Sequence, residues 1–241
     1  MKCIILAAGY ATRMYPLTEN YPKPLLEVGG KPILDWLVDD LKAVVEQFIV
    51  ISNHKYAKHF IRWAENKPAV VVDDGTSTNE TRLGAVCDIQ FAIDKLQLSH
   101  EDLLIIAGDN VLDFSLCSFV DYSIVAGTSC TLRYWEEDPV KLRRAGISEI
   151  DGEKLIGFDE KPKKPKSNWC TPPFYYYIAA DIQKIREAIT DGCGTDAPGS
   201  LVAWMCKRSP MHSMVMPGRR YDIGNLESYQ KIKENYKGPM K

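Results

Sequence analysis

The chain opens on a segment that strongly constrains its fold, because Met1–Ala8 is almost entirely apolar and runs directly into Gly9. A short apolar run that stops at a glycine is typical of a strand buried on both faces, and parallel sheets are built from such strands. Helices then have to cover both faces of the sheet. The opening residues therefore favour an α/β fold with a buried strand at its start.

Alternating patterns extend this architecture through the first half of the chain. Lys31–Val45 and Leu83–Leu96 each carry apolar residues three or four positions apart, which is the spacing of a helix with one buried face. Short buried strands are predicted at Phe48–Ser52, Val70–Val72 and Leu103–Ala107. The alternation of strand and helix predicts a Rossmann-like, doubly wound sheet in which most strands are parallel.

The pattern changes after about residue 127, where short strands become frequent. Asp151-Gly152, a dipeptide typical of a tight hairpin, joins the predicted strands Ile147–Ile150 and Lys154–Phe158. The other predicted elements are the strands Ser129–Trp135, Phe174–Ile178 and Met211–Met216, the helices Ile182–Ile189 and Ser200–Lys207, and the loop Pro162–Pro173. Asn225 is predicted to cap a last helix, whose Leu226, Tyr229 and Tyr236 face inward. We therefore predict one α/β domain over residues 1–241, made of the halves 1–127 and 128–241, in which the sheet is mixed and carries a small β-rich insertion.

Composition limits the classes of partner. Acidic and basic residues nearly balance, 32 against 30, so the net charge of −2 gives no global field that would recruit nucleic acid or an anionic membrane. The seven cysteines are scattered, odd in number and without a C-x-x-C pair, which favours the reduced thiols of a cytosolic protein over disulfides or a zinc site. The opening apolar run is too short for a signal peptide or a membrane span. We expect a soluble, cytoplasmic protein that binds neither nucleic acid nor membranes.

A loop from Gly9 to Thr18 follows the first strand and carries Arg13. In a parallel sheet the ligand crevice lies beyond the carboxyl ends of the strands, where backbone N–H groups of such a loop can point at a phosphate. Arg13 would add a permanent positive charge, although the same residues also fit a simple turn with a surface arginine. Ala11 and Met14 stand where the dinucleotide-binding pattern G-x-G-x-x-G requires glycine, so that motif is absent.

A lysine between two prolines, Lys23 in Pro22-Lys23-Pro24, is the next candidate. The flanking prolines stiffen the backbone, so the ammonium group would be held at a fixed place. A second phosphate contact is one interpretation of Lys23, and an ordinary solvated lysine is the other.

Two aspartates occupy matching places in the pattern. Asp109 and Asp222 each follow a predicted strand and stand close to a glycine. Carboxylate oxygens at such a strand end suit Mg²⁺, which takes one or two carboxylates together with substrate phosphates. Either residue alone also fits a turn aspartate, so a shared Mg²⁺ site is a hypothesis.

The second strand of the predicted hairpin ends on opposite charges, Glu160 and Lys161, followed by Pro162. They offer one acceptor and one cation at the mouth of the strand, or they form a solvated pair. The four histidines show neither metal-ligand spacing nor a nucleophile–base pattern, so we predict surface or packing roles for them.

Together these segments resemble the sugar-1-phosphate nucleotidyltransferases, the superfamily of the glucose-1-phosphate thymidylyl- and uridylyltransferases. The opening Leu6-Ala7-Ala8-Gly9-x-Ala11-Thr12-Arg13-x-x-Pro16-Leu17-Thr18 and the later Pro22-Lys23-Pro24-Leu25 are similar to the family signature L-A-A-G-x-G-T-R-x-x-P-L-T and P-K-P-L. Gly108-Asp109, Glu160-Lys161-Pro162 and Asp222-Ile223-Gly224 match in order and approximate spacing, so the resemblance runs from Met1 to about Tyr229. It implies a GT-A-like nucleotidyltransferase fold.

The resemblance also implies roles for individual residues. The half 1–127 would bind the nucleotide and the half 128–241 the sugar phosphate. The implied nucleotide-binding residues are Leu6, Ala8, Gly9, Tyr10, Ala11, Thr12 and Gly84; the implied catalytic residues are Arg13, Lys23 and Asp109; the implied sugar-phosphate-binding residues are Gly146, Glu160 and Lys161; and Asp109 with Asp222 would hold Mg²⁺. Ala11 departs from the family pattern, which has glycine at that position.

The implied activity is the Mg²⁺-dependent transfer of a nucleotidyl group from dTTP, UTP or CTP to a sugar 1-phosphate, of which glucose 1-phosphate is the first candidate. The products would be a nucleoside diphosphate sugar and pyrophosphate. One alternative is cytidylyl transfer to phosphocholine or a phosphonate, and another is a regulator that binds sugar nucleotides without catalysis. The nucleotide base, the acceptor, the pathway and whether the protein forms a homo-oligomer stay open.

Overall fold

The computed structural model describes residues 1–239, together with the backbone but not the side chain of Asp222, and its chain divides into two compact units. Unit 1 comprises Met1–Arg82, Ala107–Cys117 and the segment from Pro217 onward. Unit 2 comprises Leu83–Ile106 and Ser118–Met216. The segments of the two units therefore interleave along the chain, and each unit is described by itself below.

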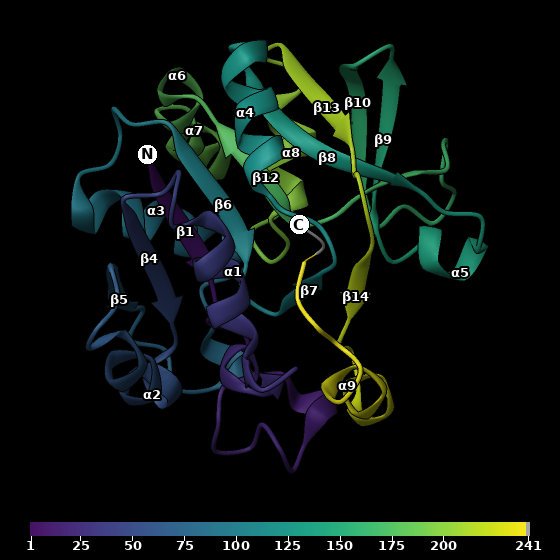
Figure 1. Cartoon of the computed structure of the whole chain (residues 1–241). Coiled ribbons are helices and arrows are strands. Elements are labelled where there is room, and N and C mark those ends of the chain that lie inside the picture. Colours follow the sequence, from purple (N-terminus) through teal and green to yellow (C-terminus); the bar gives the residue numbers. More distant parts are fainter. Residues whose placement is uncertain (240–241) are drawn as a thin grey trace. The chain divides into compact units, whose positions relative to one another are not determined.

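Unit 1 is built on parallel strands. β4 (Gln47–Ser52) lies between β1 (Lys2–Leu6) and β5 (Ala69–Asp73), with Ile4 opposite Ile49 and Ile49 opposite Val70 (Figure 1). The central residues of β1 and β4 are completely buried, as the apolar sequence predicts for strands covered on both faces. The predicted parallel arrangement of these strands is confirmed.

The helices of unit 1 follow the apolar spacing, but the helix predicted over Lys31–Val45 is shorter at both ends and already stops at Leu41. The α-helices are α1 (Ile33–Leu41), α2 (His54–Ala64) and α9 (Leu226–Lys233), and the short 3-10 helices are η1 (Thr12–Met14), η2 (Lys23–Leu25) and η3 (Asn79–Thr81). Two small antiparallel ladders pair β2 (Glu27–Val28) with β3 (Lys31–Pro32) and β7 (Asn110–Leu112) with β14 (Arg220–Asp222). The helix predicted from Lys31 begins only at Ile33, because the two preceding residues pair with β2.

The last helix carries the predicted cap. The Asn225 side chain accepts a hydrogen bond of 2.9 Å from the Ser228 N–H, and Ser228 bonds back to the Asn225 backbone. Tyr229 and Tyr236 are buried as predicted, whereas Leu226 is 38% exposed, so its predicted inward orientation is wrong. Leu226 is the first residue of α9, and the buried stripe of this helix starts one turn later, at Tyr229.

Unit 2 is built on a mixed sheet. Its strand order is β11 (Trp169–Thr171), β9 (Gly146–Asp151), β10 (Lys154–Glu160), β13 (Met211–Val215), β8 (Ser129–Trp135), β12 (Phe174–Tyr177) and β6 (Leu103–Ala107). β13 and β8 are parallel, while β9–β10, β10–β13 and β12–β6 are antiparallel (Figure 1). The predicted mixed α/β fold and the hairpin at Asp151-Gly152 are thereby confirmed. The loop predicted over Pro162–Pro173 is partly wrong, because it contains β11.

The helices of unit 2 are mostly short. They are α3 (Ala85–Leu96), α4 (Cys117–Ala126), α5 (Pro139–Leu142), α6 (Ala179–Ile182), α7 (Ile185–Thr190) and α8 (Gly199–Met205), and α8 packs against β10. The single helix predicted over Ile182–Ile189 is wrong, because the chain turns between α6 and α7. Buried Asp181 holds that turn, since its carboxylate accepts hydrogen bonds from the Ser129 and Ser209 hydroxyls and from the Lys184 ammonium group.

Two further expectations concern the whole described chain. All seven cysteines lie within the described residues and are free thiols. Across residues 1–239, none of the helices combines the length and the apolar character that crossing a membrane requires.

Candidate functional site

The site residues predicted from the sequence fall into two sets. Unit 1 holds the set drawn from the first loop, the P-K-P segment and the two aspartates, namely Leu6, Ala8, Gly9, Tyr10, Ala11, Thr12, Arg13, Lys23, Asp109 and Asp222. Unit 2 holds Gly84, Gly146, Glu160 and Lys161. The geometry of each set is built up separately here.

The loop after β1 is fixed by hydrogen bonds to its backbone. β1 ends at Leu6, and the Asn53 side chain, which caps α2, donates a hydrogen bond of 2.8 Å to the Ala8 carbonyl. Ala11 adopts a left-handed conformation with φ +46°, and its carbonyl accepts a bond of 2.8 Å from the Thr18 hydroxyl. A left-handed turn is where the family pattern has glycine, so alanine is held here in a conformation that costs it free energy.

A pair of tyrosines supports the loop from the protein interior. Tyr10 is 5% exposed, and its ring centroid lies 6.1 Å from that of Tyr56. The Tyr56 hydroxyl donates a hydrogen bond of 2.6 Å to the Thr18 carbonyl. Burial, together with the neighbouring tyrosines, raises the pKa of Tyr56 to about 12, so the hydroxyl keeps its proton at neutral pH. The exposed residues of the loop are Gly9, Thr12, Arg13, Tyr15, Pro16 and Leu17.

Lys23 and Asp109 form a close ion pair in unit 1. The Lys23 ammonium lies 2.7 Å from Asp109 Oδ2, with the lysine side chain 10% exposed and the aspartate side chain 44% exposed. Burial works to raise the pKa of the Asp109 carboxyl, but the charge and hydrogen bond of Lys23, with the charge of Arg220, outweigh it and lower this pKa below its ordinary value. The carboxylate is therefore ionised at neutral pH and is still reachable by a ligand.

The other oxygen of Asp109 is also held. The buried Asn110 side chain donates hydrogen bonds to Asp109 Oδ1 over 3.2 Å and to the Ala107 carbonyl over 3.0 Å. Its own amide oxygen accepts a bond of 3.0 Å from an Arg220 Nη1 group. The amide nitrogen of Asn110 thus faces oxygen atoms that accept hydrogen bonds, and its amide oxygen faces a guanidinium group that donates one. These partners determine which way round the amide lies. Asn110 thus orients the Asp109 carboxylate.

The second aspartate lies on the strand next to this cluster. In the antiparallel ladder of β7 and β14, Asp222 stands directly opposite Asn110. Asp109 and Asp222, the two predicted metal ligands, therefore have neighbouring backbone positions, because Asp109 directly precedes the residue that Asp222 faces. This proximity is a property of unit 1 alone, and it comes from residues more than one hundred positions apart in the sequence.

An apolar cluster in unit 1 anchors every segment of this set. Met14 follows Arg13, Leu26 follows the P-K-P segment, Val111 follows Asn110 and Ile223 follows Asp222, and all four pack in one buried core. The rest of that core is Val28, Ile33, Tyr229 and Tyr236. Burying each of these side chains stabilises the fold by about 1.5–3 kcal/mol, so the positions of the charged residues are fixed by the apolar residues beside them.

The donor set of unit 1 fits a hard divalent cation. Among the side chains that the structure describes, no three His, Cys, Asp or Glu residues gather into a protein-only metal cage. Mg²⁺ does not need such a cage, since it is commonly held by one or two carboxylates together with waters and substrate phosphates. The half-exposed, ionised Asp109, with Asp222 opposite its neighbour, is a donor set of this kind.

In unit 2, Glu160 and Lys161 stand at the end of β10. The Glu160 carboxylate lies 3.6 Å from the Lys161 ammonium, with the glutamate side chain 19% and the lysine side chain 55% exposed. Burial raises the pKa of the Glu160 carboxyl, and the charge and hydrogen bond of Lys161 offset this only in part. Gly146 of β9 pairs with Glu160 across the ladder, so these three predicted residues lie together.

Gly84 has a structural reason to be glycine. It precedes α3 with φ +89°, and a Cβ atom built on it would lie 2.7 Å from the Thr195 carbonyl oxygen. The Val86 N–H donates a hydrogen bond of 2.9 Å to the same oxygen. This side of Gly84 is therefore filled by protein backbone, and only its other face is left for the nucleotide base that the resemblance implies.

Sequence reasoning missed several residues that hold the predicted ones. Asn110 adjoins Asp109 and could have been chosen as a polar residue at a strand end. Arg220 and Tyr56 gave no such signal, because their contacts join residues 110 and 38 positions apart. Contacts over such distances depend on the packing of the whole unit rather than on local spacing.

Unit 1 thus combines a loop that exposes Arg13 with an oriented carboxylate beside a lysine, and these are the residue types that bind phosphates and divalent cations in proteins. The model of the nucleotidyl transferase family matches residues 2–238 of the chain. The chain therefore belongs to that family and to the sugar-1-phosphate nucleotidyltransferase superfamily, which its sequence resembles.

Characterised relatives agree with this assignment. The chain is 32% identical over 255 residues to the bifunctional protein GlmU of Methanococcus aeolicus, which covers 100% of this chain and 56% of that protein. It is 26% identical over 234 residues to mannose-1-phosphate guanylyltransferase 1 of Arabidopsis thaliana, which covers 95% of this chain and 63% of that protein. The chain thus spans less than two thirds of the length of these relatives.

The fold is also that of a solved family member. UDP-glucose pyrophosphorylase in complex with UDP-glucose superposes with a TM-score of 0.82, covering 98% of this chain and 97% of that one, at 18% sequence identity. At this identity the likeness establishes the fold. The substrates of the chain have to be argued from its own residues.

Proposed function

We propose that the protein transfers a nucleotidyl group from a nucleoside triphosphate to a sugar 1-phosphate and releases pyrophosphate. The observation that carries this proposal is the oriented, ionised Asp109 beside Lys23, in a chain whose residues 2–238 match the nucleotidyl transferase family. The relatives named above include a mannose-1-phosphate guanylyltransferase, which supports a hexose 1-phosphate as acceptor. Glucose 1-phosphate, with dTTP, UTP or CTP as donor, is the first combination to test.

The unit 1 set would bind the triphosphate. Backbone N–H groups of the loop from Gly9 would face its phosphates, and exposed Arg13 would neutralise charge on the pyrophosphate as it leaves. Lys23 would contact a phosphate from its buried position, and Asp109 with Asp222 would hold Mg²⁺. When bound, Mg²⁺ would offset part of the triphosphate charge and orient its oxygens.

Three residues of the unit 2 set would bind the acceptor. Lys161, with its side chain 55% exposed, would bind the phosphate of the sugar phosphate, and Glu160 would accept hydrogen bonds from sugar hydroxyls. Gly146 would let the sugar approach the backbone of β9. Gly84, the remaining residue of this set, would contact the nucleotide base.

The chemistry needs no general base from the protein. A phosphomonoester oxygen is largely deprotonated at pH 7, since its second pKa is about 6. This oxygen attacks the α-phosphorus, a new P–O bond forms, and the bond to the β-phosphate breaks with its electron pair leaving on pyrophosphate. The barrier comes from bringing two polyanions together, because each pair of unit charges 4 Å apart repels by about 4 kcal/mol at an effective dielectric of 20. Arg13, Lys23 and Lys161 supply the compensating charge.

A substrate matrix tests the proposal. Each of five nucleoside triphosphates is mixed with several sugar 1-phosphates and, with CTP, also with phosphocholine and a phosphonate, and pyrophosphate release is measured with Mg²⁺. Release with a sugar 1-phosphate supports the proposal, and release only with phosphocholine or a phosphonate replaces the acceptor class. Ligand binding without release in any mixture would indicate a non-catalytic regulator. The free thiols agree with a cytoplasmic location, which we include in the proposal.

A further inference from the structure

The Glu160 carboxylate occupies a space in unit 2 that two glycines leave open. Gly146 faces it across the β9–β10 ladder, and a Cβ atom built on Gly146 would lie 3.1 Å from Glu160 Oε2. Gly199 reaches it from α8, nearly forty residues later in the sequence. A Cβ atom on Gly199 would overlap Glu160 Oε2 and lie 3.0 Å from Glu160 Cδ.

An aromatic ring closes the same space. Phe158 precedes Glu160 by two residues on β10, so both side chains lie on one face of the strand. A Cβ atom on Gly146 would overlap Cζ of the buried Phe158 ring, and Cε1 of the same ring lies 3.2 Å from the Cβ position of Gly199. The carboxylate is therefore confined on three sides, by two glycines and one ring.

The backbone at Gly199 does not require glycine. Gly199 is the first residue of α8 and has helical rather than left-handed geometry, a conformation that any residue adopts. Gly199 is buried, and the atom nearest to its Cβ position is Glu160 Oε2. The volume that this glycine leaves open is therefore occupied mainly by the Glu160 carboxylate.

We propose that Gly199 is a positioning residue for the acceptor site and acts through Glu160. Without a side chain at this position, the carboxylate stays where it can accept a hydrogen bond from a hydroxyl of the sugar phosphate. A methyl group at this position would turn the carboxylate aside and leave the hydroxyl without its acceptor. This inference rests on the proposed function, because it assigns a residue that determines affinity for the sugar phosphate. Gly199 itself is not proposed to contact the ligand.

The Gly199→Ala variant tests the proposal through steady-state kinetics. The displaced atom is the free end of a flexible side chain, so the variant is expected to fold. Its KM for the sugar phosphate should rise about 10-fold, as expected when a hydrogen bond to a charged group is lost. Its KM for the nucleoside triphosphate and its kcat should stay within twofold of the wild type. Ser200→Ala, a change at the next residue of α8, is the matched control and should leave all three constants unchanged.

A double-mutant cycle shows whether Gly199 acts through Glu160. Glu160→Ala alone should raise the KM for the sugar phosphate, and adding Gly199→Ala in that background should raise it no further. If Gly199→Ala alone lowers the melting temperature, the double variant should regain it, because the clash with the carboxylate is gone. A double variant that stays destabilised would assign the clash to Phe158 and overturn the proposal.

The remaining outcomes separate this inference from the proposed function. An active wild type with an unchanged KM in Gly199→Ala overturns the inference alone. An additive rise of KM in the double variant does the same, because it shows that Gly199 acts independently of Glu160. A wild type that releases no pyrophosphate with any sugar phosphate overturns the proposed function, and the inference with it.

Discussion

The ammonium group of Lys23 lies 2.7 Å from Oδ2 of Asp109, and the two residues are 86 positions apart in the sequence. The lysine is nearly buried while the carboxylate is half-exposed, so the pair joins an anchored cation to a carboxylate that a ligand can reach. A phosphate and a divalent cation would each find one partner here. The pair therefore suits a ligand that brings both charges, as a metal-bound nucleoside triphosphate does.

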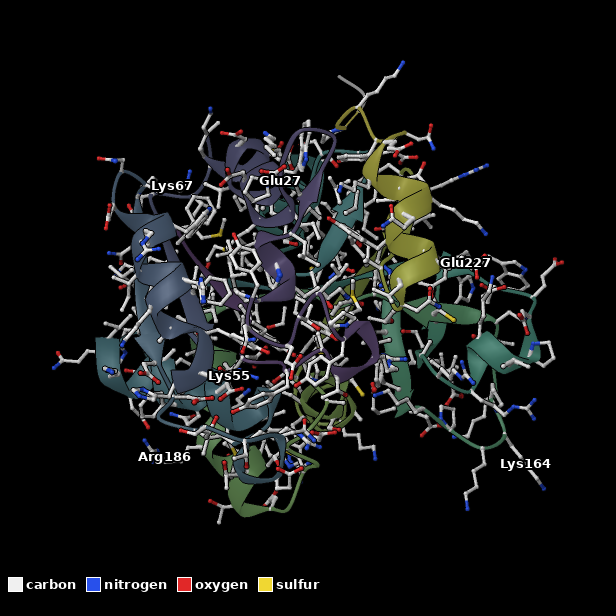
Figure 2. The ribbon with its side chains drawn as sticks, turned by 90° about the horizontal axis from the view of Figure 1, so that it is seen from below. Glu27, Lys55, Lys67, Lys164, Arg186 and Glu227 are labelled. Carbon is white, nitrogen blue, oxygen red and sulfur yellow. The ribbon has the colours of Figure 1, made fainter. Side chains whose placement is uncertain are left out.

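Lys161→Ala should weaken binding of the sugar phosphate. The change removes a charge-assisted contact to phosphate worth about 1.5–3 kcal/mol, so the KM for the sugar phosphate should rise at least about 10-fold in steady-state kinetics. Lys164→Ala is the matched control, because Figure 2 shows Lys164 extending into solvent from the loop after β10.

Arg13→Ala should have a different effect, mainly a lower kcat, because Arg13 is assigned to the leaving pyrophosphate. Equal and small effects of the Lys161 and Arg13 substitutions on both constants would refute this division of roles.

Ala11→Gly should stabilise the protein slightly. Alanine in the left-handed conformation costs roughly 1–2 kcal/mol, and glycine returns roughly 0.5–1 kcal/mol of this through the greater freedom of its unfolded chain. The net gain of about 0.5 kcal/mol corresponds to a rise in melting temperature of about 1–2 °C. Gly9→Ala is the control, because a Cβ atom there meets no neighbour within 4 Å and the backbone is not left-handed; removing the unfolded-state freedom of this glycine should stabilise the protein by about 0.4–1 kcal/mol. A clear fall for Ala11→Gly would show that the left-handed backbone is not strained.

Tyr56→Phe should destabilise the loop after β1. The Thr18 carbonyl loses the hydrogen bond that the Tyr56 hydroxyl donates, at a cost of about 1–2 kcal/mol and a fall in melting temperature of about 2–6 °C. Tyr21→Phe, at an exposed ring, should change the melting temperature little.

The same variant has a predicted pH dependence at high pH. The folded pKa of Tyr56 is raised to about 12 from an unfolded value near 10, so its stabilising contribution is complete below pH 10 and is lost as the pH rises toward 12. The free energy of unfolding of Tyr56→Phe should therefore fall less steeply over this range than that of the wild type. Parallel slopes for the two proteins would contradict the assignment.

Glu160→Gln should raise stability at neutral pH while weakening acceptor binding. Burial raises the folded pKa of Glu160, so the protonated form is favoured and the ionised form costs stability once the pH exceeds that pKa. Melting temperatures should favour Glu160→Gln at pH 7, and the difference should shrink toward pH 4. Glu227, which lies on α9 (Figure 2), is the opposite case: its pKa is lowered by its hydrogen bond and charge pairing with Lys231, so Glu227→Gln should bring no gain. A Glu160→Gln variant less stable than the wild type at pH 7 would contradict the account.

The sequence was most informative where local pattern determines structure. The buried strand at Met1–Ala8, the hairpin at Asp151-Gly152 and the Asn225 cap follow from spacing and turn chemistry within a few residues, and all were predictable. The break between α6 and α7 was not, because it depends on buried Asp181 and its partners Ser129 and Ser209, which lie far apart in the chain.

The candidate site shows the same division. The charged residues could be selected from motifs, but the residues that orient them could not. Asn110 holds Asp109 and is itself held by Arg220, and Glu160 depends on the space left by Gly199. A glycine that provides volume for a side chain elsewhere in the chain has no signature in its own neighbourhood.

The central claim is that an oriented Asp109 carboxylate supports Mg²⁺-dependent nucleotidyl transfer. The direct measurement is the rate of pyrophosphate release by the wild type, Asp109→Asn and Asp39→Asn, each with Mg²⁺ and with EDTA. Asp39 serves as the control because its carboxylate forms an exposed surface ion pair with Lys31. The account predicts that the wild type and Asp39→Asn are active only with Mg²⁺ and that Asp109→Asn is slower by about 100-fold or more. Release by the wild type at full rate in EDTA, or by Asp109→Asn at the wild-type rate, would contradict it.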